Sequence, residues 1–209
     1  MKPTSPGRWR ATVAASRFLP CLLPLALAAP AALALDMARP EVRAFVDELV
    51  SQDGYDRGVL EAALKGAETR QSILDAMARP AEKVKPWYDY RGIFLTPARI
   101  SGGVDCYREH EARLKQVSAA TGVAPEYLVA ILGVETFYGT RTGSFRAVDA
   151  LATLAFDYPP RAKFFRSELR HLFLLAQEEQ LDVTGITGSY AGALGPPQFI
   201  PSSYRAYAV

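Results

Sequence analysis

The feature that most restricts the fold of this chain is a run of apolar residues with helical spacing between residues 162 and 176. Apolar side chains recur there at steps of three and four residues, so they lie on one face of a helix. A helix with one apolar face is stabilised by packing that face against other elements, which requires a core. The residues of this face are Ala162, Phe165, Leu169, Leu172, Phe173 and Ala176.

Start and stop residues mark further helices along the chain. Pro40 suits the first position of a helix that ends at Asp53-Gly54, and Asp56 is placed to cap the next one. We interpret residues 79–103, which are rich in proline and aromatic residues, as a connector. Because no segment alternates convincingly between apolar and polar residues, we expect a mainly α domain. The other expected helices cover residues 104–122, 125–136, 147–156 and a short stretch from Pro201.

Residues 1–34 have the composition of a secretory signal peptide. Basic residues without any acidic one precede an apolar stretch that ends in small residues. Ala32-Leu33-Ala34 matches an A-x-A cleavage site, which would leave residues 35–209 as one mature domain. Prolines in the apolar stretch disfavour a stable membrane-spanning helix, and an uncleaved anchor is the alternative. We therefore expect an exported, periplasmic protein without a stable membrane span once the leader is removed.

Removal of this leader would reverse the sign of the net charge. The whole chain has 24 basic and 22 acidic residues, a formal +2. Loss of the four basic residues Lys2, Arg8, Arg10 and Arg17 leaves 20 basic against 22 acidic residues, a formal −2. The basic balance belongs to the leader, so we expect no binding of nucleic acid.

Cysteine and histidine are too few for a disulfide framework or a metal centre. Cys106 is the only cysteine after the leader, so no internal disulfide can form, and we expect this residue to be structural. The chain has two histidines and lacks a Cys/His/Asp pattern with ligand spacing. We expect neither a metal nor a cofactor.

The segment VAILGVETFYGTRTG, residues 129–143, places Glu135 after an apolar run near the expected end of a helix. A carboxylate in apolar surroundings is costly unless it is paired, and the negative end of the helix dipole also disfavours its charge. Both effects favour a carboxyl that stays protonated near neutral pH, which suits a general acid. Periodicity alone leaves two interpretations open: a surface residue at a helix end, or a proton donor.

Cleavage of a glycosidic bond ordinarily uses a second carboxylate within roughly 5–10 Å of the first. Glu126 lies earlier in the same expected helix, about 13 Å away, and its position in the first turn suits a helix-end charge. Asp149 and Asp157 are candidates only if the fold brings them close. A mechanism with one carboxylate is open where the N-acetyl group of the substrate assists.

A second segment, GSYAGALGPPQFIPSS (residues 188–203), combines glycine, proline and aromatic residues. Its glycines permit tight turns and close approach of the backbone to a ligand. Gln198 offers both a donor and an acceptor for a sugar hydroxyl or acetamido group, and Tyr190 and Phe199 have faces on which sugars can stack. Single aromatic residues more often belong to a core, so this segment by itself is a loop of undetermined role.

Together, the two segments resemble the family of lytic murein transglycosylases B, within the lysozyme-like superfamily. The resemblance rests on G-V-E-T-x-x-G, followed about fifty residues later by G-S-[FY]-A-G-A-x-G-x-x-Q-F-x-P-S-S-Y, and on the intervening residues 149–179. It covers most of residues 40–209 and is densest from Val123 onward. It implies a lysozyme-like helical transglycosylase domain.

The resemblance also implies roles for single residues. Glu135 matches the family's one catalytic glutamate. That glutamate protonates the glycosidic oxygen between N-acetylmuramic acid and N-acetylglucosamine, then acts as a base and yields a 1,6-anhydromuramoyl end. Ser189 matches a serine near the substrate acetamido group, Gln198 a groove glutamine, and Arg161 the second of two arginines that contact peptidoglycan. The implied partners are peptidoglycan glycan strands and, as a further class, proteins of cell-wall synthesis.

Three features depart from the family pattern. Pro160 stands in place of the first of the two arginines, so one positive contact with the substrate would be lost. Pro196-Pro197 precede Gln198 where many relatives have a glycine, which removes a backbone donor. The sequence ends at Val209, before the further helices of the family and the calcium-binding loop of some members. We therefore expect a domain that is incomplete at its C-terminus and binds no calcium.

Two other functions remain open at this point. A hydrolysing muramidase would need a positioned water molecule and a second acid, such as Asp149 or Asp157. A non-catalytic peptidoglycan-binding or scaffold protein would need neither.

Overall fold

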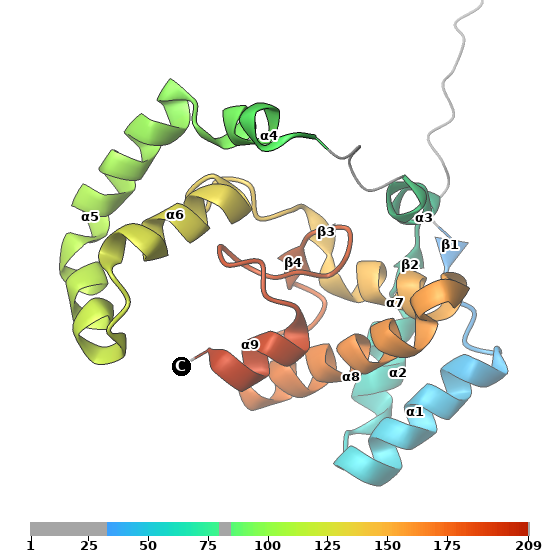
Figure 1. Ribbon diagram of the computed structural model, residues 1–209. Helices are drawn as coiled ribbons and strands as arrows, with labels where there is room; N and C mark the ends of the chain where they lie inside the picture. Colours follow the sequence, from blue (N-terminus) through green and yellow to red (C-terminus); the bar gives the residue numbers. More distant parts are fainter. Residues whose placement is uncertain (1–32, 80–84, 209) are drawn as a thin grey trace, which may run out of the picture.

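The computed structural model describes residues 33–79 and 85–208, which are mainly helical (Figure 1). The four strands within these residues have two residues each and pair antiparallel, two by two. The predicted mainly α class is therefore confirmed. The predicted signal peptide lies outside the described residues, apart from Leu33 and Ala34. The pairs are β1 (Leu33–Ala34) with β2 (Glu68–Thr69) and β3 (Phe145–Arg146) with β4 (Thr187–Gly188).

Helix boundaries that depend on capping residues agree with the prediction. α1 (Pro40–Asp53) begins at Pro40 and ends before Gly54, which has a φ of 66°. α2 (Arg57–Lys65) is capped by Asp56, whose carboxylate accepts a 2.8 Å hydrogen bond from the Val59 amide. Also where the sequence predicts them are α6 (Pro125–Thr136), α7 (Ala147–Asp157), α8 (Ala162–Glu178) and α9 (Pro201–Tyr207).

The interpretation of residues 79–103 as a connector is wrong for most of its length. It contains α4 (Trp87–Phe94) and the beginning of α5 (Pro97–Thr121). The start of α5 has an ordinary capping signal, because the Thr96 hydroxyl accepts a hydrogen bond from the Arg99 amide at 3.3 Å and a proline follows it. Residues 80–84 of this segment lie outside the described residues. A further helix, α3 (Gln71–Ala78), is not predicted by the sequence pattern.

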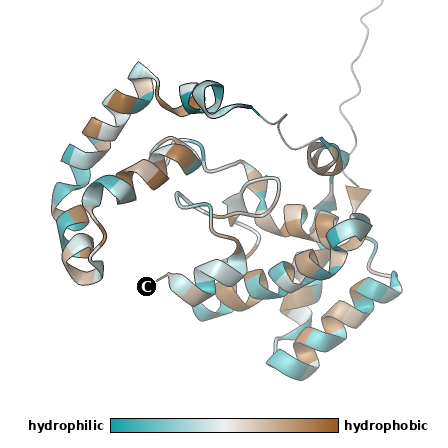
Figure 2. Ribbon diagram, viewed as in Figure 1, coloured by the Kyte–Doolittle hydropathy of each residue, from teal (hydrophilic) through white to brown (hydrophobic). Residues whose placement is uncertain are grey.

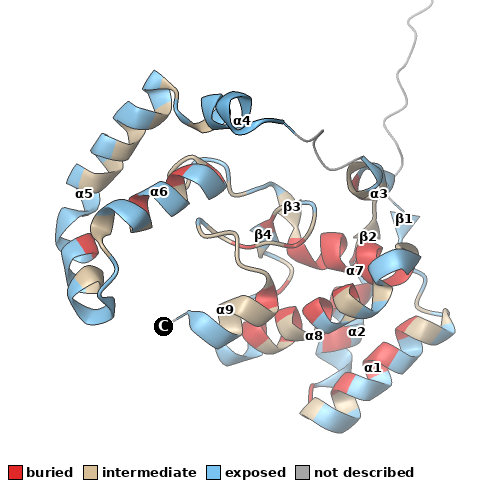
Figure 3. Cartoon of the chain, viewed as in Figure 1, coloured by how far each residue is buried: buried red, intermediate tan, exposed pale blue. Residues whose placement is uncertain are grey.

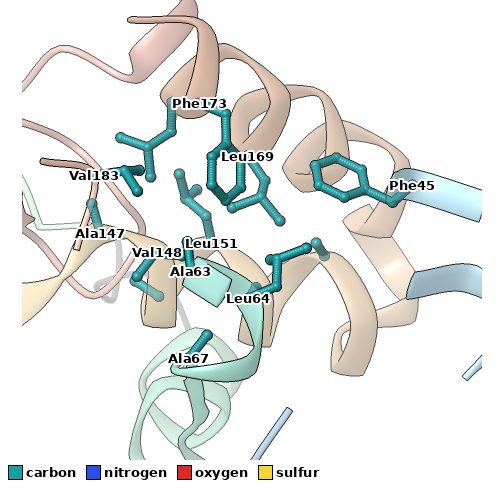
Figure 4. Close-up of a cluster of buried hydrophobic side chains, with 14 of the residues drawn as sticks. Phe45, Ala63, Leu64, Ala67, Ala147, Val148, Leu151, Leu169, Phe173 and Val183 are labelled. Atoms are coloured by element: carbon teal, nitrogen blue, oxygen red, sulfur yellow. The ribbon is translucent and has the colours of Figure 1, made fainter. Parts of the chain in front are cut away.

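The core is built around α7, which packs along α8 and also contacts α2, α3 and β2 (Figure 1). Every residue from Ala147 to Phe156 is buried, so α7 has no exposed face over that length. The apolar face predicted for α8 is buried against it, apart from the half-buried Ala162. Phe45 of α1 and Phe173 of α8 belong to one buried cluster with residues of α2 and α7, several of which are labelled in Figure 4. The centroids of these two rings lie 6.4 Å apart.

We call α4, α5 and α6 together the arm, because they curve away from this core and bury few side chains (Figures 1 and 3). α4 has no buried residue, and α5 has one, Leu114. Figure 2 shows that α6 is nevertheless largely hydrophobic. Among the described residues no single helix is long and apolar enough to cross a membrane. α5 and α6 reach that length and hydropathy only as a pair bent by 113°.

His171 lies in the middle of α8 and faces α9. Its Nδ1 atom is 2.6 Å from a guanidinium nitrogen of Arg205, which also forms an ion pair with Glu178 at 2.5 Å. Burial and the positive charge of Arg205 lower the pKa of His171 below its ordinary value. The folded protein therefore favours the neutral ring, whose nitrogen can accept a hydrogen bond from Arg205.

We expect the free energy of unfolding to fall as the pH drops below about 6.5. The unfolded chain then takes up a proton on His171 that the folded chain resists. His171→Gln should therefore make the melting temperature less dependent on pH between about 7.5 and 5.5. His110→Gln, on the exposed surface of α5, is the control and should keep the wild-type dependence. The same pH dependence in all three proteins would contradict this account.

Candidate active site

Glu135 lies in the last turn of α6, as predicted, but its side chain is exposed. The apolar surroundings that the sequence led us to expect are not found among the described residues, because Ile131 is 54% and Val134 49% exposed. Near Glu135, the residues of α6 that are buried are Gly133 and Thr136, and not the apolar Ile131 and Val134. The apolar run thus includes an exposed face of the helix, and Glu135 is accessible from solvent.

The backbone makes a left-handed turn directly after α6. Phe137, Tyr138 and Gly139 have φ angles of 51°, 60° and 82°. This conformation costs about 1–2 kcal/mol for each residue with a Cβ atom, so other contacts must hold the turn. One of them is a 2.8 Å hydrogen bond from the Arg141 amide to the Thr136 carbonyl, which satisfies a free acceptor at the helix end.

The ring of Tyr138 fills a slot between α5 and α6 that is lined by three glycines. A Cβ atom at Gly133 would lie 2.7 Å from the ring, one at Gly103 2.9 Å from its hydroxyl, and one at Gly102 3.0 Å from the ring. The hydroxyl donates a 2.7 Å hydrogen bond to the Arg99 carbonyl of α5. Tyr138 therefore fixes the turn and the two helices relative to one another.

Arg99 provides a second connection between α5 and α6. Its guanidinium group donates a hydrogen bond to the Gly133 carbonyl near the end of α6. It also lies over the rings of Phe137 and Phe94, at 5.0 and 5.3 Å from their centroids. A cation is favourable at the C-terminal end of a helix, where the carbonyl groups carry partial negative charge.

Two side chains join the end of α6 to the second motif segment. The Thr136 hydroxyl donates a 2.9 Å hydrogen bond to the Pro196 carbonyl. The side-chain amide of Gln198 donates to the carbonyl groups of Thr142, at 3.2 Å, and Gly195, at 2.9 Å. The fold thus brings together two segments that lie far apart in the sequence.

Ser189 and the glycines of the second segment shape the loop itself. The Ser189 hydroxyl accepts a 3.0 Å hydrogen bond from the Ala193 amide. A Cβ atom at Gly188 would lie 2.3 Å from the Ala193 carbonyl oxygen, and one at Gly192 would lie 2.4 Å from the Leu151 side chain. At these two positions the absence of a side chain lets other atoms of this chain approach the backbone closely.

Of the remaining predicted residues, Tyr190 and Phe199 lie in the second motif segment, whereas Arg161 lies at the start of α8. Tyr190, in the same loop, is 42% exposed. Phe199 is half-buried, and its backbone exchanges hydrogen bonds of 2.7 and 3.2 Å with Leu194. Arg161 is the last residue of a 3-10 turn (Pro159–Arg161) that precedes α8. The Cζ atom of its guanidinium group lies 4.1 Å from the ring centroid of Phe164. Within residues 33–79 and 85–208, no hydrogen bond or ion pair connects Arg161 to the other predicted site residues.

The two acids considered as partners of Glu135 are held by arginines. Asp149 is fully buried, and the Arg146 guanidinium group binds both of its oxygens, at 2.7 and 2.9 Å. Asp157 forms a 2.6 Å ion pair with Arg39. Both carboxylates are therefore paired with arginines in the folded chain.

Sequence reasoning missed Thr136, Tyr138 and Arg99 as parts of this region. The glycines of α5 and α6 are a signal that could have pointed to a bulky residue packed between these helices. No local pattern marks Arg99, because its partners Gly133 and Phe137 become its neighbours only in the folded chain. The described residues contain no group of three or more His, Cys, Asp or Glu side chains that could hold a metal ion.

Known proteins resemble this chain in both sequence and structure. Residues 37–209 match the family described as "Transglycosylase SLT domain". Over 179 residues the chain is 41% identical to membrane-bound lytic murein transglycosylase B of Escherichia coli (strain K12), a match that covers 81% of this chain and 50% of that protein. It also resembles the soluble lytic transglycosylase SltB1 from Pseudomonas aeruginosa, with a TM-score of 0.80, 54% identity, and coverage of 81% of this chain and 57% of that one.

SltB3 from Pseudomonas aeruginosa, solved in complex with NAG-NAM-pentapeptide, is a more distant match. Its TM-score is 0.74 at 29% identity, and the match covers 80% of this chain and 44% of that one. The present chain belongs to the transglycosylase SLT domain family, and its resemblance to the lytic murein transglycosylases B is confirmed, as is the lysozyme-like helical fold. It spans about half the length of the curated relative that it matches.

Gly133→Ala should destabilise the protein by about 1–3 kcal/mol, because the added methyl group would displace the Tyr138 ring. Chemical denaturation followed by circular dichroism would measure the change. Gly92→Ala in α4 is the matched control, since nothing lies within 4 Å of the added Cβ atom there. Alanine also has the higher helix propensity, so this control should be as stable as the wild type or more stable. A Gly133→Ala protein with wild-type stability would show that the ring is not confined by the slot.

Proposed function

We propose that this protein is an exported, periplasmic lytic transglycosylase that cleaves the β-1,4 bond between N-acetylmuramic acid and N-acetylglucosamine in peptidoglycan. The observation that carries the proposal is the family match over residues 37–209, combined with an accessible Glu135 whose neighbour Thr136 is hydrogen-bonded to the loop of Gln198. The complex of SltB3 with NAG-NAM-pentapeptide supports the substrate class, because its two sugars are those of the proposed bond.

In the proposed reaction, Glu135 acts twice. Its protonated carboxyl first gives a proton to the glycosidic oxygen as the bond from that oxygen to C1 of the muramoyl sugar breaks. The resulting carboxylate then takes the proton from the C6 hydroxyl of the same sugar, whose oxygen bonds to C1. The product is a 1,6-anhydromuramoyl end, no water is consumed, and Glu135 is protonated again.

Because Glu135 is exposed in the free chain, the bound substrate itself would have to shield its carboxyl from water. A bound glycan strand would cover the carboxyl and exclude water from it, and desolvation favours the neutral form of a carboxylic acid. On this proposal, the acid is prepared for proton transfer when the strand binds.

The predicted binding residues have hydrogen-bonding groups that suit a sugar. Gln198 uses its amide nitrogen on the Thr142 and Gly195 carbonyl groups, so its amide oxygen is the group offered to the substrate. The Ser189 hydroxyl accepts from a backbone amide and can donate its proton to an acetamido oxygen. Tyr190 and Phe199 would stack on sugar faces. Arg161 would contact peptidoglycan from the start of α8.

The decisive measurement is mass spectrometry of the muropeptides that the purified protein releases from sacculi. We expect anhydromuramoyl ends from the wild type, and on the order of 10²–10⁴-fold less product from Glu135→Gln, which cannot donate the proton. Glu126→Gln, at the exposed first turn of the same helix, is the matched control and should retain wild-type activity.

Other outcomes would each contradict a defined part of the proposal. Reducing ends in place of anhydro ends would indicate a hydrolase. Release of no muropeptide by the wild type would contradict the proposed activity of this chain. Full activity in Glu135→Gln would move the catalytic acid elsewhere.

A further inference from the structure

Thr136, the residue that follows Glu135, is a buried polar residue with 1% of its surface exposed. Its hydroxyl donates to the Pro196 carbonyl at 2.9 Å and accepts from the Gly139 amide at 2.9 Å. The Leu132 carbonyl, at 3.4 Å, is a weaker second acceptor. A hydroxyl has one proton to donate and lone pairs to accept, and here both functions are directed to backbone groups from two separate segments.

These contacts form a short closed connection between the two motif segments. Pro196 lies two residues before Gln198, whose side chain returns to the Thr142 carbonyl beyond the left-handed turn. Gln198 itself has a φ of 52°, which is unusual for a residue with a Cβ atom and must be held by its surroundings. The Thr136 hydroxyl is therefore the direct link between the end of α6 and the loop before Gln198.

We propose that Thr136 is a positioning residue, which holds the Glu135 carboxyl and the Gln198 amide at a fixed separation across the substrate. The inference rests on the proposed function, because it concerns the geometry of that reaction. Catalytic groups depend steeply on placement, and an error of about 1 Å can cost about 100-fold in rate.

The left-handed turn does not depend on Thr136 alone. Tyr138 is held in its glycine slot, and Arg99 binds the Gly133 carbonyl. Loss of the Thr136 hydroxyl should therefore leave the helix end in place, while the loop of Gln198 keeps the hydrogen bond from Gln198 to the Thr142 carbonyl and loses its attachment at Pro196. A positioning role then predicts a loss of turnover that exceeds the loss of stability.

The test compares Thr136→Val, which keeps the shape and removes the hydroxyl, with Thr136→Ser, which keeps the hydroxyl. We expect Thr136→Val to lower kcat for release of anhydromuropeptides by about 10- to 100-fold, with little change in KM. Thr136→Ser should recover most of the turnover. Thr140→Val is the matched control, because the Thr140 hydroxyl donates to the Phe137 carbonyl within the same turn and does not reach the loop. This control should retain wild-type kcat.

A double-mutant cycle with Gln198→Ala separates positioning from a general loss of structure. If Thr136 acts by aligning Gln198 with Glu135, Thr136→Val should have little additional effect on kcat once Gln198 is alanine. Two fully additive effects would overturn the inference. Wild-type kcat in Thr136→Val would also overturn it, as would equal losses in the valine and serine variants with matching falls in melting temperature.

The failure of the proposed function would look different. It would be a wild-type protein that releases no anhydromuropeptide. The outcomes that overturn only the role of Thr136 all require an active wild type.

Discussion

Burial of α7 on all sides is the constraint on which the rest of the structure depends. A helix without an exposed face must satisfy its polar side chains inside the protein. The Asp149 carboxylate accordingly binds Arg146 and also accepts a 3.0 Å hydrogen bond from the Glu68 amide. The Thr153 hydroxyl donates to the Asp149 carbonyl at 2.7 Å and accepts from the Arg70 amide at 3.1 Å. The polar groups of the central helix thus attach β2 and the start of α3 to the core.

The candidate site lies where this core meets the arm, and the two parts are stabilised differently. The core buries large apolar side chains from several helices, whereas α4, α5 and α6 bury almost none. Contacts of Tyr138 and Arg99 hold α5 and α6 together, and the Thr136 hydroxyl connects them to the loop of Gln198. The core is therefore stabilised mainly by apolar burial, and the arm by a few specific contacts, which also set the geometry around Glu135.

Local signals explain what could be predicted from the sequence. A proline or an aspartate at the start of a helix acts within one turn, so α1, α2, α6 and α9 could be located from capping alone. The start of α5 has the same kind of signal but lies among prolines and aromatic residues, which favoured a connector. The contact of Thr136 with Pro196 spans 60 residues and has no local signature. The environment of Glu135 was wrongly predicted because α6 is apolar on nearly every face, so periodicity does not reveal which face is buried.

Two glycines near Glu135 are constrained for opposite reasons. At Gly133 the backbone is helical, and the Tyr138 ring leaves no room for the Cβ atom of another residue. At Gly139 the nearest atom to an added Cβ is 3.8 Å away, so there is room, and the restriction comes from a φ of 82°. That φ is natural for a residue of the opposite chirality. An L-residue at position 139 would therefore have space for its side chain but would carry about 1–2 kcal/mol of backbone strain. The side chain is excluded by lack of space at Gly133 and by the backbone conformation at Gly139, and the two glycines lie before and after Glu135 in the sequence.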